Sequence, residues 1–244
     1  MAAPRVSDAD PDPALARFLQ RVQKTFSHDL RTPLSTIVNY AAVLEANQET
    51  NAEEVRDLAR RMRENALRAA RMIQLLATAV GLASRPMTTS STDLAALARS
   101  VLVDSGGAGD VRVPSHSSSV ASIDAEVVGF AWRAYVAVES DATGVPVRGA
   151  ILEMRPADDE VTIELSCGSS PRSATPEAVE LAQYLRHNGG PARLENAMGF
   201  TLAQALVESH GGDFGVWGRP GAASGLRLRL PARDRSARAL PREA

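Results

Sequence analysis

The sequence predicts an α+β fold in two parts, an N-terminal antiparallel helical hairpin followed by an α/β sandwich. Apolar residues recur at three- and four-residue spacings through 13–46 and again through 52–83, which indicates two long amphipathic helices. Only the short polar stretch 47–51 separates them, and long helices joined by a short loop pack antiparallel. After residue 92 the pattern changes to short helices and strands, as expected for a second domain.

The apolar stripe of the hairpin predicts self-association. Two helices leave one apolar face uncovered, and two copies of the hairpin would close a four-helix bundle, so we expect a homodimer. Asn65 falls within the heptad stripe of the second helix, where it either sets the register or lies at the edge of the bundle. The residues expected to dimerise include Leu30, Ile37, Leu58, Met62 and Leu76.

The second domain is predicted over 93–233, after a turn-rich linker at 84–92. Asp93 is placed to cap a helix that ends near Val103. We expect further helices at 125–138, 176–187 and 199–209, and strands at 111–113, 120–123, 147–154, 161–166, 214–218 and 226–230. Helices against a mixed sheet make an α/β sandwich, and residues 1–12 and 234–244 are expected to be disordered.

Composition narrows the class of protein. An apolar fraction of 44% and a charged fraction of 23% are those of a soluble globular protein. A net charge of −2 with few aromatic residues argues against a nucleic-acid binder. We find no apolar signal core and no run of roughly 18 apolar residues, so we expect a cytoplasmic protein without a membrane span. The single cysteine, Cys167, fits a reducing compartment.

The most informative stretch is FSHDLRTPL, residues 26–34, which places His28 off the apolar stripe of the first helix. An exposed imidazole is a nucleophile near neutral pH and can carry a phosphoryl group. Asp29 can accept a hydrogen bond from one ring nitrogen, although helical neighbours face apart, so this contact needs local distortion. Pro33 supplies a cause, because it has no N–H for the carbonyl of Asp29 and its ring should kink the helix. Lys24 and Arg31 can neutralise a phosphate.

Residues 27–34 resemble the phosphoacceptor box of the sensor histidine kinases of two-component signalling, which reads Ser-His-Asp/Glu-Leu-Arg-Thr-Pro-Leu. The resemblance implies that His28 is the phosphoacceptor, Asp29 its acid/base partner, and Thr32 the residue that positions water when a partner regulator is dephosphorylated. It also implies that the receiver domain of a response regulator docks on this face. The residues expected to contact it are Ser35, Thr36, Asn39 and Tyr40.

The second domain resembles the ATP-binding domain of that family only weakly, at 93–98, 199–203 and 208–212. The Asn-rich helix that holds magnesium is replaced by AWRAYVAVE, residues 131–139, and alanine and valine offer no oxygen ligand. Where the family places the carboxylate that reads adenine, this chain has Cys167. Of the Gly-x-Gly that approaches the phosphates, only Gly199 is in place.

We therefore expect no ATP, no metal and no cofactor of the chain's own. The remaining histidines, His116, His187 and His210, lack metal-ligand spacing. Glu139 and Asp141 are interpreted as a solvated helix end.

The leading hypothesis is a dimeric histidine phosphotransferase of a phosphorelay, which resembles bacterial phosphotransferases that combine a helical-hairpin dimer with a vestigial ATPase-like domain. It would exchange phosphoryl groups with receiver domains, including those of a hybrid histidine kinase, and the receiver would supply Mg²⁺. The alternatives are a pseudokinase scaffold that binds a kinase or receiver without phosphotransfer, and an active histidine kinase with an atypical nucleotide site.

Overall fold

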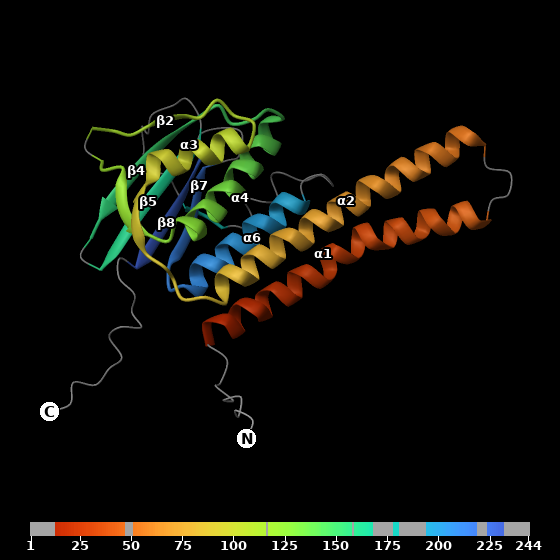
Figure 1. Ribbon diagram of the computed structural model, residues 1–244, viewed down its shortest axis with the longest axis horizontal. Coiled ribbons are helices and arrows are strands. Elements are labelled where there is room, and N and C mark those ends of the chain that lie inside the picture. Colours follow the sequence, from red (N-terminus) through yellow and green to blue (C-terminus); the bar gives the residue numbers. More distant parts are fainter. Residues whose placement is uncertain are drawn as a thin grey trace, which may run out of the picture.

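The computed structural model describes residues 13–46, 51–115, 117–157, 159–167, 178–180, 194–218 and 224–231. Helices α1, Pro13–Ala46, and α2, Ala52–Ala83, have the predicted bounds and lie side by side as an antiparallel hairpin (Figure 1). Asn51 fixes the start of α2, because its side chain accepts hydrogen bonds from the backbone N–H groups of Glu53 and Glu54. The Glu54 carboxylate accepts the N–H of Asn51 in return, which completes a capping box.

The second domain contains a six-stranded mixed sheet. Among the strands that the structure describes, only β2 and β4 run parallel, and the other neighbours are antiparallel. In order across the sheet the strands are β2 Asp110–Arg112, β4 Gly149–Pro156, β5 Glu160–Cys167, β8 Ser224–Pro231, β7 Asp213–Gly218 and β6 Ala178–Val179. A separate two-stranded ribbon pairs β1, Ser90–Asp93, with β3, Val120–Ile123.

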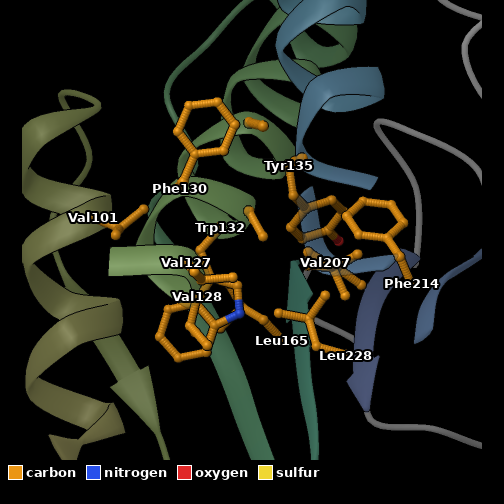
Figure 2. Close-up of a cluster of buried hydrophobic side chains, with 14 of the residues drawn as sticks. Val101, Val127, Val128, Phe130, Trp132, Tyr135, Leu165, Val207, Phe214 and Leu228 are labelled. Carbon is orange, nitrogen blue, oxygen red and sulfur yellow. The ribbon is translucent and has the colours of Figure 1, made fainter. Parts of the chain in front are cut away.

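Three helices, α3 Leu94–Asp104, α4 Ala125–Thr143 and α6 Leu194–Ser209, cover one face of this sheet (Figure 1). Helix α4 is apolar on nearly all sides because it packs against the sheet, α3 and α6 at once. Figure 2 shows Trp132 and Tyr135 of α4 among the side chains that meet Leu165 of β5, Leu228 of β8 and Phe214 of β7. The sheet domain therefore has a continuous core, as the predicted α/β sandwich requires.

The hairpin shares that core. Phe18 and Val22 of α1 and Met72 of α2 belong to the same buried cluster as the strands of the sheet. Helix α6 lies along the half of the hairpin that holds the start of α1 and the end of α2, while the half that ends at the interhelical loop extends away from the sheet (Figure 1). Among the described residues, the second domain consequently covers one half of the hairpin and leaves the other half uncovered.

Several sequence predictions need correction. The helix expected at 176–187 is wrong at Ala178–Val179, which form strand β6 because they pair with β7, and the rest of that stretch lies outside the described residues. The last three residues assigned to the linker, 90–92, belong to β1. Helix α4 runs past the predicted end at Val138 and stops at Gly144, whose φ of 70° suits a glycine C-cap. The stretches 1–12, 47–50 and 234–244 also lie outside the described residues.

Helix α2 also qualifies the expectation about membrane spans. Its most apolar 18-residue window has a mean hydropathy of 1.3, so by length and composition it is long and apolar enough to cross a membrane. This criterion is weak evidence, since core helices of soluble proteins meet it as well. In this structure α2 packs against α1 and α6.

Candidate functional site

His28 and Asp29 are in contact on the surface of α1. Nδ1 of His28 lies 3.1 Å from Oδ1 of Asp29, which confirms the contact predicted for these neighbours. The side chain of His28 is 86% exposed, whereas that of Asp29 is only 17% exposed. The carboxylate is thus held against the protein while the ring extends into solvent. With a proton on Nδ1 donated to Asp29, the lone pair is on Nε2, which is then the nucleophilic atom.

The next turn of α1 contains the proline that interrupts its hydrogen bonding. Pro33 is buried, and the helix continues through it to Ala46. Because proline has no N–H, the carbonyl of Asp29 lacks its usual helical donor. One residue earlier, the carbonyl of Thr32 accepts a hydrogen bond from the hydroxyl of Thr36 at 2.9 Å.

Some of the other predicted site residues have exposed side chains, and others contact the protein itself. Arg31, Thr32, Ser35 and Asn39 are exposed, within three turns of His28. Thr36 is half-buried, and its hydroxyl is used within α1. The side chain of Lys24 lies outside those that the structure describes. The surface next to His28 is therefore formed by Arg31, Thr32, Ser35 and Asn39.

Tyr40 is tied to the neighbouring helix. The pKa of Arg61 on α2 is raised by two interactions. The larger effect comes from the Tyr40 hydroxyl and the smaller one from the carboxylate of Asp57. Nε of Arg61 donates to Asp57 at 2.7 Å, and Arg60 also donates to Asp57. Tyr40 thus lies beside a charged network whose other members are all on α2. Its position also marks which levels of α1 and α2 lie side by side.

A groove of about 440 Å³ runs along α1 beside the exposed histidine. Two of its apolar side chains, Leu34 and Val38, are 45% and 66% exposed. Exposed apolar surface of this kind is typical of association sites. Its lining alternates apolar and polar residues, namely Phe26, Ser27, Leu30, Arg31, Leu34, Ser35, Val38 and Asn39.

The positions of α4 expected for nucleotide chemistry carry mainly apolar side chains. Ala131, Ala134 and Val138 of α4 are buried and supply no oxygen ligand. The interpretation of Glu139 as a solvated helix end is wrong: this residue is 2% exposed, and its Oε1 accepts a hydrogen bond from Oγ of Ser224 at 2.6 Å. The reason is that α4 extends beyond Val138, which brings Glu139 against the start of β8.

Asp141 is likewise only partly exposed. Its Oδ2 accepts a hydrogen bond from Nδ2 of Asn196 on α6 at 2.6 Å. Both carboxylates at the end of α4 therefore join elements of the fold.

Cys167 is part of the same buried polar network. Burial raises the pKa of its thiol to about 12, with a contribution from the negative charge of Glu139 that outweighs the opposing hydrogen bond from Tyr135. The Tyr135 hydroxyl accepts the backbone N–H of Cys167 at 3.4 Å and lies 3.0 Å from Oγ of Ser224. The residue is thus a neutral buried thiol, which cannot accept hydrogen bonds from adenine as a carboxylate does.

Gly199 lies where α6 packs against α2. It lies within α6, and a Cβ there would come 3.6 Å from a methyl group of Leu75 on α2. Of the other histidines, Nε2 of His210 lies 3.2 Å from the carbonyl of Leu82, while His116 and His187 lie outside the described residues. In the described part of the chain no three His, Cys, Asp or Glu side chains come together as a metal site would require.

The structure also reveals a buried ion pair near the junction of the two domains that sequence reasoning missed. Asp124 is 2% exposed and accepts two hydrogen bonds from Arg85, at 2.7 and 3.0 Å, and one from the N–H of Thr88 at 2.9 Å. It also caps α4 through the N–H groups of Glu126 and Val127. Burial by itself raises the pKa of Asp124, but these hydrogen bonds outweigh it and hold the pKa below its usual range. The sequence indicates the cap, because an Asp stands directly before a predicted helix. It gives no sign that Arg85, far away in the chain, is the partner of Asp124.

Known proteins provide an independent comparison. Residues 18–78 match the family profile of the His Kinase A (phospho-acceptor) domain. None of the curated proteins is a detectable relative by sequence.

Among solved structures, the histidine kinase ThkA in complex with the response regulator protein TrrA has a TM-score of 0.59 at 12% identity, over 96% of this chain and 69% of that one. The Acinetobacter baumannii histidine kinase AdeS has a TM-score of 0.50 at 10% identity, over 84% and 98% of the two chains. At these identities the likeness establishes the fold alone.

A third match concerns length. Full-length ShkA in complex with AMPPNP is 18% identical, and the match covers 86% of this chain but 45% of ShkA, with a TM-score of 0.48. The chain thus spans less than half the length of that kinase. The hairpin thus carries the match to the His Kinase A (phospho-acceptor) domain, and the chain as a whole shares the fold of the histidine kinases ThkA and AdeS.

Proposed function

We propose that this protein is a histidine phosphotransferase of a two-component phosphorelay, which carries a phosphoryl group on His28 to or from receiver domains and does not bind ATP. One observation carries the proposal: His28 is exposed on α1 with Nδ1 3.1 Å from the largely buried carboxylate of Asp29. This arrangement supplies a nucleophilic nitrogen and a fixed counter-charge at one place on the surface.

The chemistry follows from that pair. Nε2 of His28 attacks the phosphorus of a receiver's aspartyl phosphate in line. The N–P bond forms as the P–O bond to the receiver's carboxylate breaks, and the electron pair of that bond stays on the carboxylate. The imidazole becomes cationic in this step, and Asp29 stabilises it through the Nδ1–H···O hydrogen bond. Exposed Arg31, one turn away, is available to a phosphate oxygen.

A receiver domain is the partner that best fits this surface. The related fold of ThkA is known in complex with a response regulator, TrrA. In our proposal the receiver contributes Mg²⁺ and the aspartyl phosphate, and it contacts Ser35 and Asn39, which are exposed beside the groove on α1. Partner choice should then depend on these two side chains, because they are met before the chemical step. Thr32 is proposed to act on water when a receiver is dephosphorylated.

The absence of ATP chemistry is proposed from the residues of the second domain. Ala134, Val138 and Cys167 offer neither the oxygen ligands of Mg²⁺ nor a carboxylate for adenine. The phosphoryl group on His28 would then come from a partner and not from a nucleotide.

A homodimer is also part of the proposal. Leu34 and Val38 on α1 and Leu67 and Ile73 on α2 are exposed apolar side chains on the hairpin, and a second copy would remove them from water.

The test is transfer from receiver domains loaded with labelled acetyl phosphate. Label should pass to the protein as an acid-labile, base-stable phosphohistidine, and His28→Gln should abolish it while binding persists. His116→Gln is the matched control and should keep full transfer. Receiver binding without label on His28 would identify a scaffold, and label from magnesium ATP alone would identify an autokinase; either result would overturn the proposal.

A further inference from the structure

Two anchor points fasten α2 to the second domain. At the first, Nε of Arg71 donates to Oε1 of Glu195 on α6 at 2.7 Å. At the second, just past the end of α2, Arg85 forms its two hydrogen bonds with Asp124 at the start of α4. At 1.5 Å per helical residue, these anchor points are roughly 20 Å apart.

The second anchor immobilises the segment that leaves α2. Besides Arg85, the carboxylate of Asp124 binds the backbone N–H of Thr88, so two positions of this connection are tied to one buried group. Arg85 reaches Glu126 as well, at 2.9 Å. A hinge needs a few residues whose backbone torsions are free to change. Here Arg85 and Thr88, which lie where a hinge would be, are both bound to the buried carboxylate of Asp124.

Close packing fills the distance between the anchors. A Cβ at Gly199 of α6 would lie 3.6 Å from a methyl group of Leu75, and the carbonyl of Leu82 lies 3.2 Å from Nε2 of His210. Met72 and Ala79 are fully buried in the shared core. Rotation about either anchor would have to break the other and expose this apolar surface, so the contacts oppose motion in more than one direction.

The covered region ends close to the level of His28. Tyr40 of α1 lies beside Arg61 of α2, and because the helices are antiparallel, His28 lies near the level of Ile73. Arg71, which holds the N-terminal turn of α6, is half a turn from that level. In Figure 1 one end of α6 lies beside α2, and no labelled element of the second domain lies along the outer half of the hairpin.

We propose that the second domain is a fixed brace on the hairpin, held in a single orientation by the Arg71–Glu195 and Arg85–Asp124 anchors. A domain held in this way does not travel to deliver a phosphoryl group, and it leaves the outer half of the hairpin open to a docking protein. The inference concerns the mechanics of the chain and does not depend on whether His28 carries phosphate.

Distance measurement between spin labels tests the brace in the full chain. Cysteines at the exposed positions Ala59→Cys on α2 and Ser100→Cys on α3 would carry the labels. Cys167 needs no replacement, because it is buried and its thiol pKa is raised to about 12. The labelled protein is diluted with an excess of unlabelled protein, so that distances between the two subunits of a dimer are not recorded. We expect one narrow distance distribution, unchanged by magnesium ATP or by His28→Gln. A broad or two-peaked distribution in this background would overturn the proposal.

Two variants separate the anchors from general effects on α2. Arg71→Ala with Arg85→Ala should broaden the distribution. Arg60→Ala is the matched control, because it breaks an exposed pair with Asp57 and Glu64 far from the brace and should leave the distribution narrow. A folded double variant that keeps the narrow distance would refute the role of the anchors.

If the double variant fails to fold, hydrogen exchange of the unaltered protein decides. The amide hydrogen of Thr88, which is donated to the carboxylate of Asp124, should exchange slowly with solvent. Rapid exchange there would contradict a brace held at Asp124.

Discussion

Nδ1 of His28 and Oδ1 of Asp29 lie 3.1 Å apart although the two residues are neighbours on one helix. Successive helical side chains point about 100° apart, so this contact is not a default of helix geometry. The buried Pro33, four residues after Asp29, removes one hydrogen bond from the same turn. The helix thus places the Asp29 carboxylate against Nδ1 of His28 and leaves Nε2 available to a partner.

Asp29→Asn should slow phosphoryl transfer while leaving receiver binding nearly unchanged. The amide keeps the shape of the carboxylate but removes the charge that stabilises the cationic ring. A positioned acid or base is worth roughly 100-fold or more in rate, so we expect a loss of about that size. Single-turnover transfer from a labelled receiver measures the rate. An unchanged rate would show that Asp29 has no part in the reaction.

Nucleotide binding should be undetectable at millimolar ATP in the presence of magnesium. Ala131, Ala134 and Val138 of α4 offer no oxygen to the metal, and the neutral thiol of Cys167 stands where a carboxylate for adenine is expected. Micromolar affinity requires about 8 kcal/mol, which such a surface does not supply. Titration calorimetry is the measurement, and a magnesium-dependent dissociation constant in the micromolar range would contradict the prediction.

The full chain should be a dimer, and Val38→Asp should dissociate it. Val38 is 66% exposed, so a charge there costs little in the monomer but would be buried in a four-helix interface. Val103→Asp on α3, at a site 57% exposed, is the control and should remain dimeric. Light scattering gives the mass. Leu58→Asp should dissociate or unfold the protein, because Leu58 is half-buried. A monomeric wild-type protein would refute the four-helix arrangement.

Acid should weaken the junction between the two domains. The pKa of Asp124 is lower in the folded protein than its ordinary value of 3.8, so its ionised form stabilises the fold at higher pH. This contribution is fully present above the unfolded pKa and disappears as the pH falls through the folded pKa. Arg85→Ala should cost roughly 3 kcal/mol at neutral pH, since it leaves a buried carboxylate unpaired.

Denaturant unfolding at pH 7 and at pH 3 measures this effect. The difference in stability between wild type and Arg85→Ala should shrink at the lower pH. A difference that stays constant would assign the effect to packing of the arginine side chain and not to the ion pair.

Cys167 should be inert to thiol reagents in the native protein. Its side chain is buried at the end of β5, and the raised pKa of about 12 keeps it protonated at pH 8. Ellman's reagent should therefore react only after unfolding in guanidinium chloride. Rapid reaction of the folded protein would indicate that this end of the sheet opens readily.

The sequence by itself determined the hairpin and its candidate nucleophile. The bounds of α1 and α2 were predictable because long helices are local structures, encoded by a continuous apolar period and by caps such as Asn51. The motif around His28, residues 27–34, was equally easy to predict, since all of its residues lie within two turns of one helix. The Asp29 contact followed from the same local chemistry.

Only the tertiary structure decided what depends on residues far apart in the chain. Ala178–Val179 form a strand because β7 offers them a partner, and Glu139 is buried because Ser224 of β8 meets it there. The pairing of Arg85 with Asp124 and of Arg71 with Glu195 likewise joins separate segments. The physical reason is that a side chain's neighbours across the fold determine its burial and its pKa, and periodicity along the sequence contains no information about those neighbours.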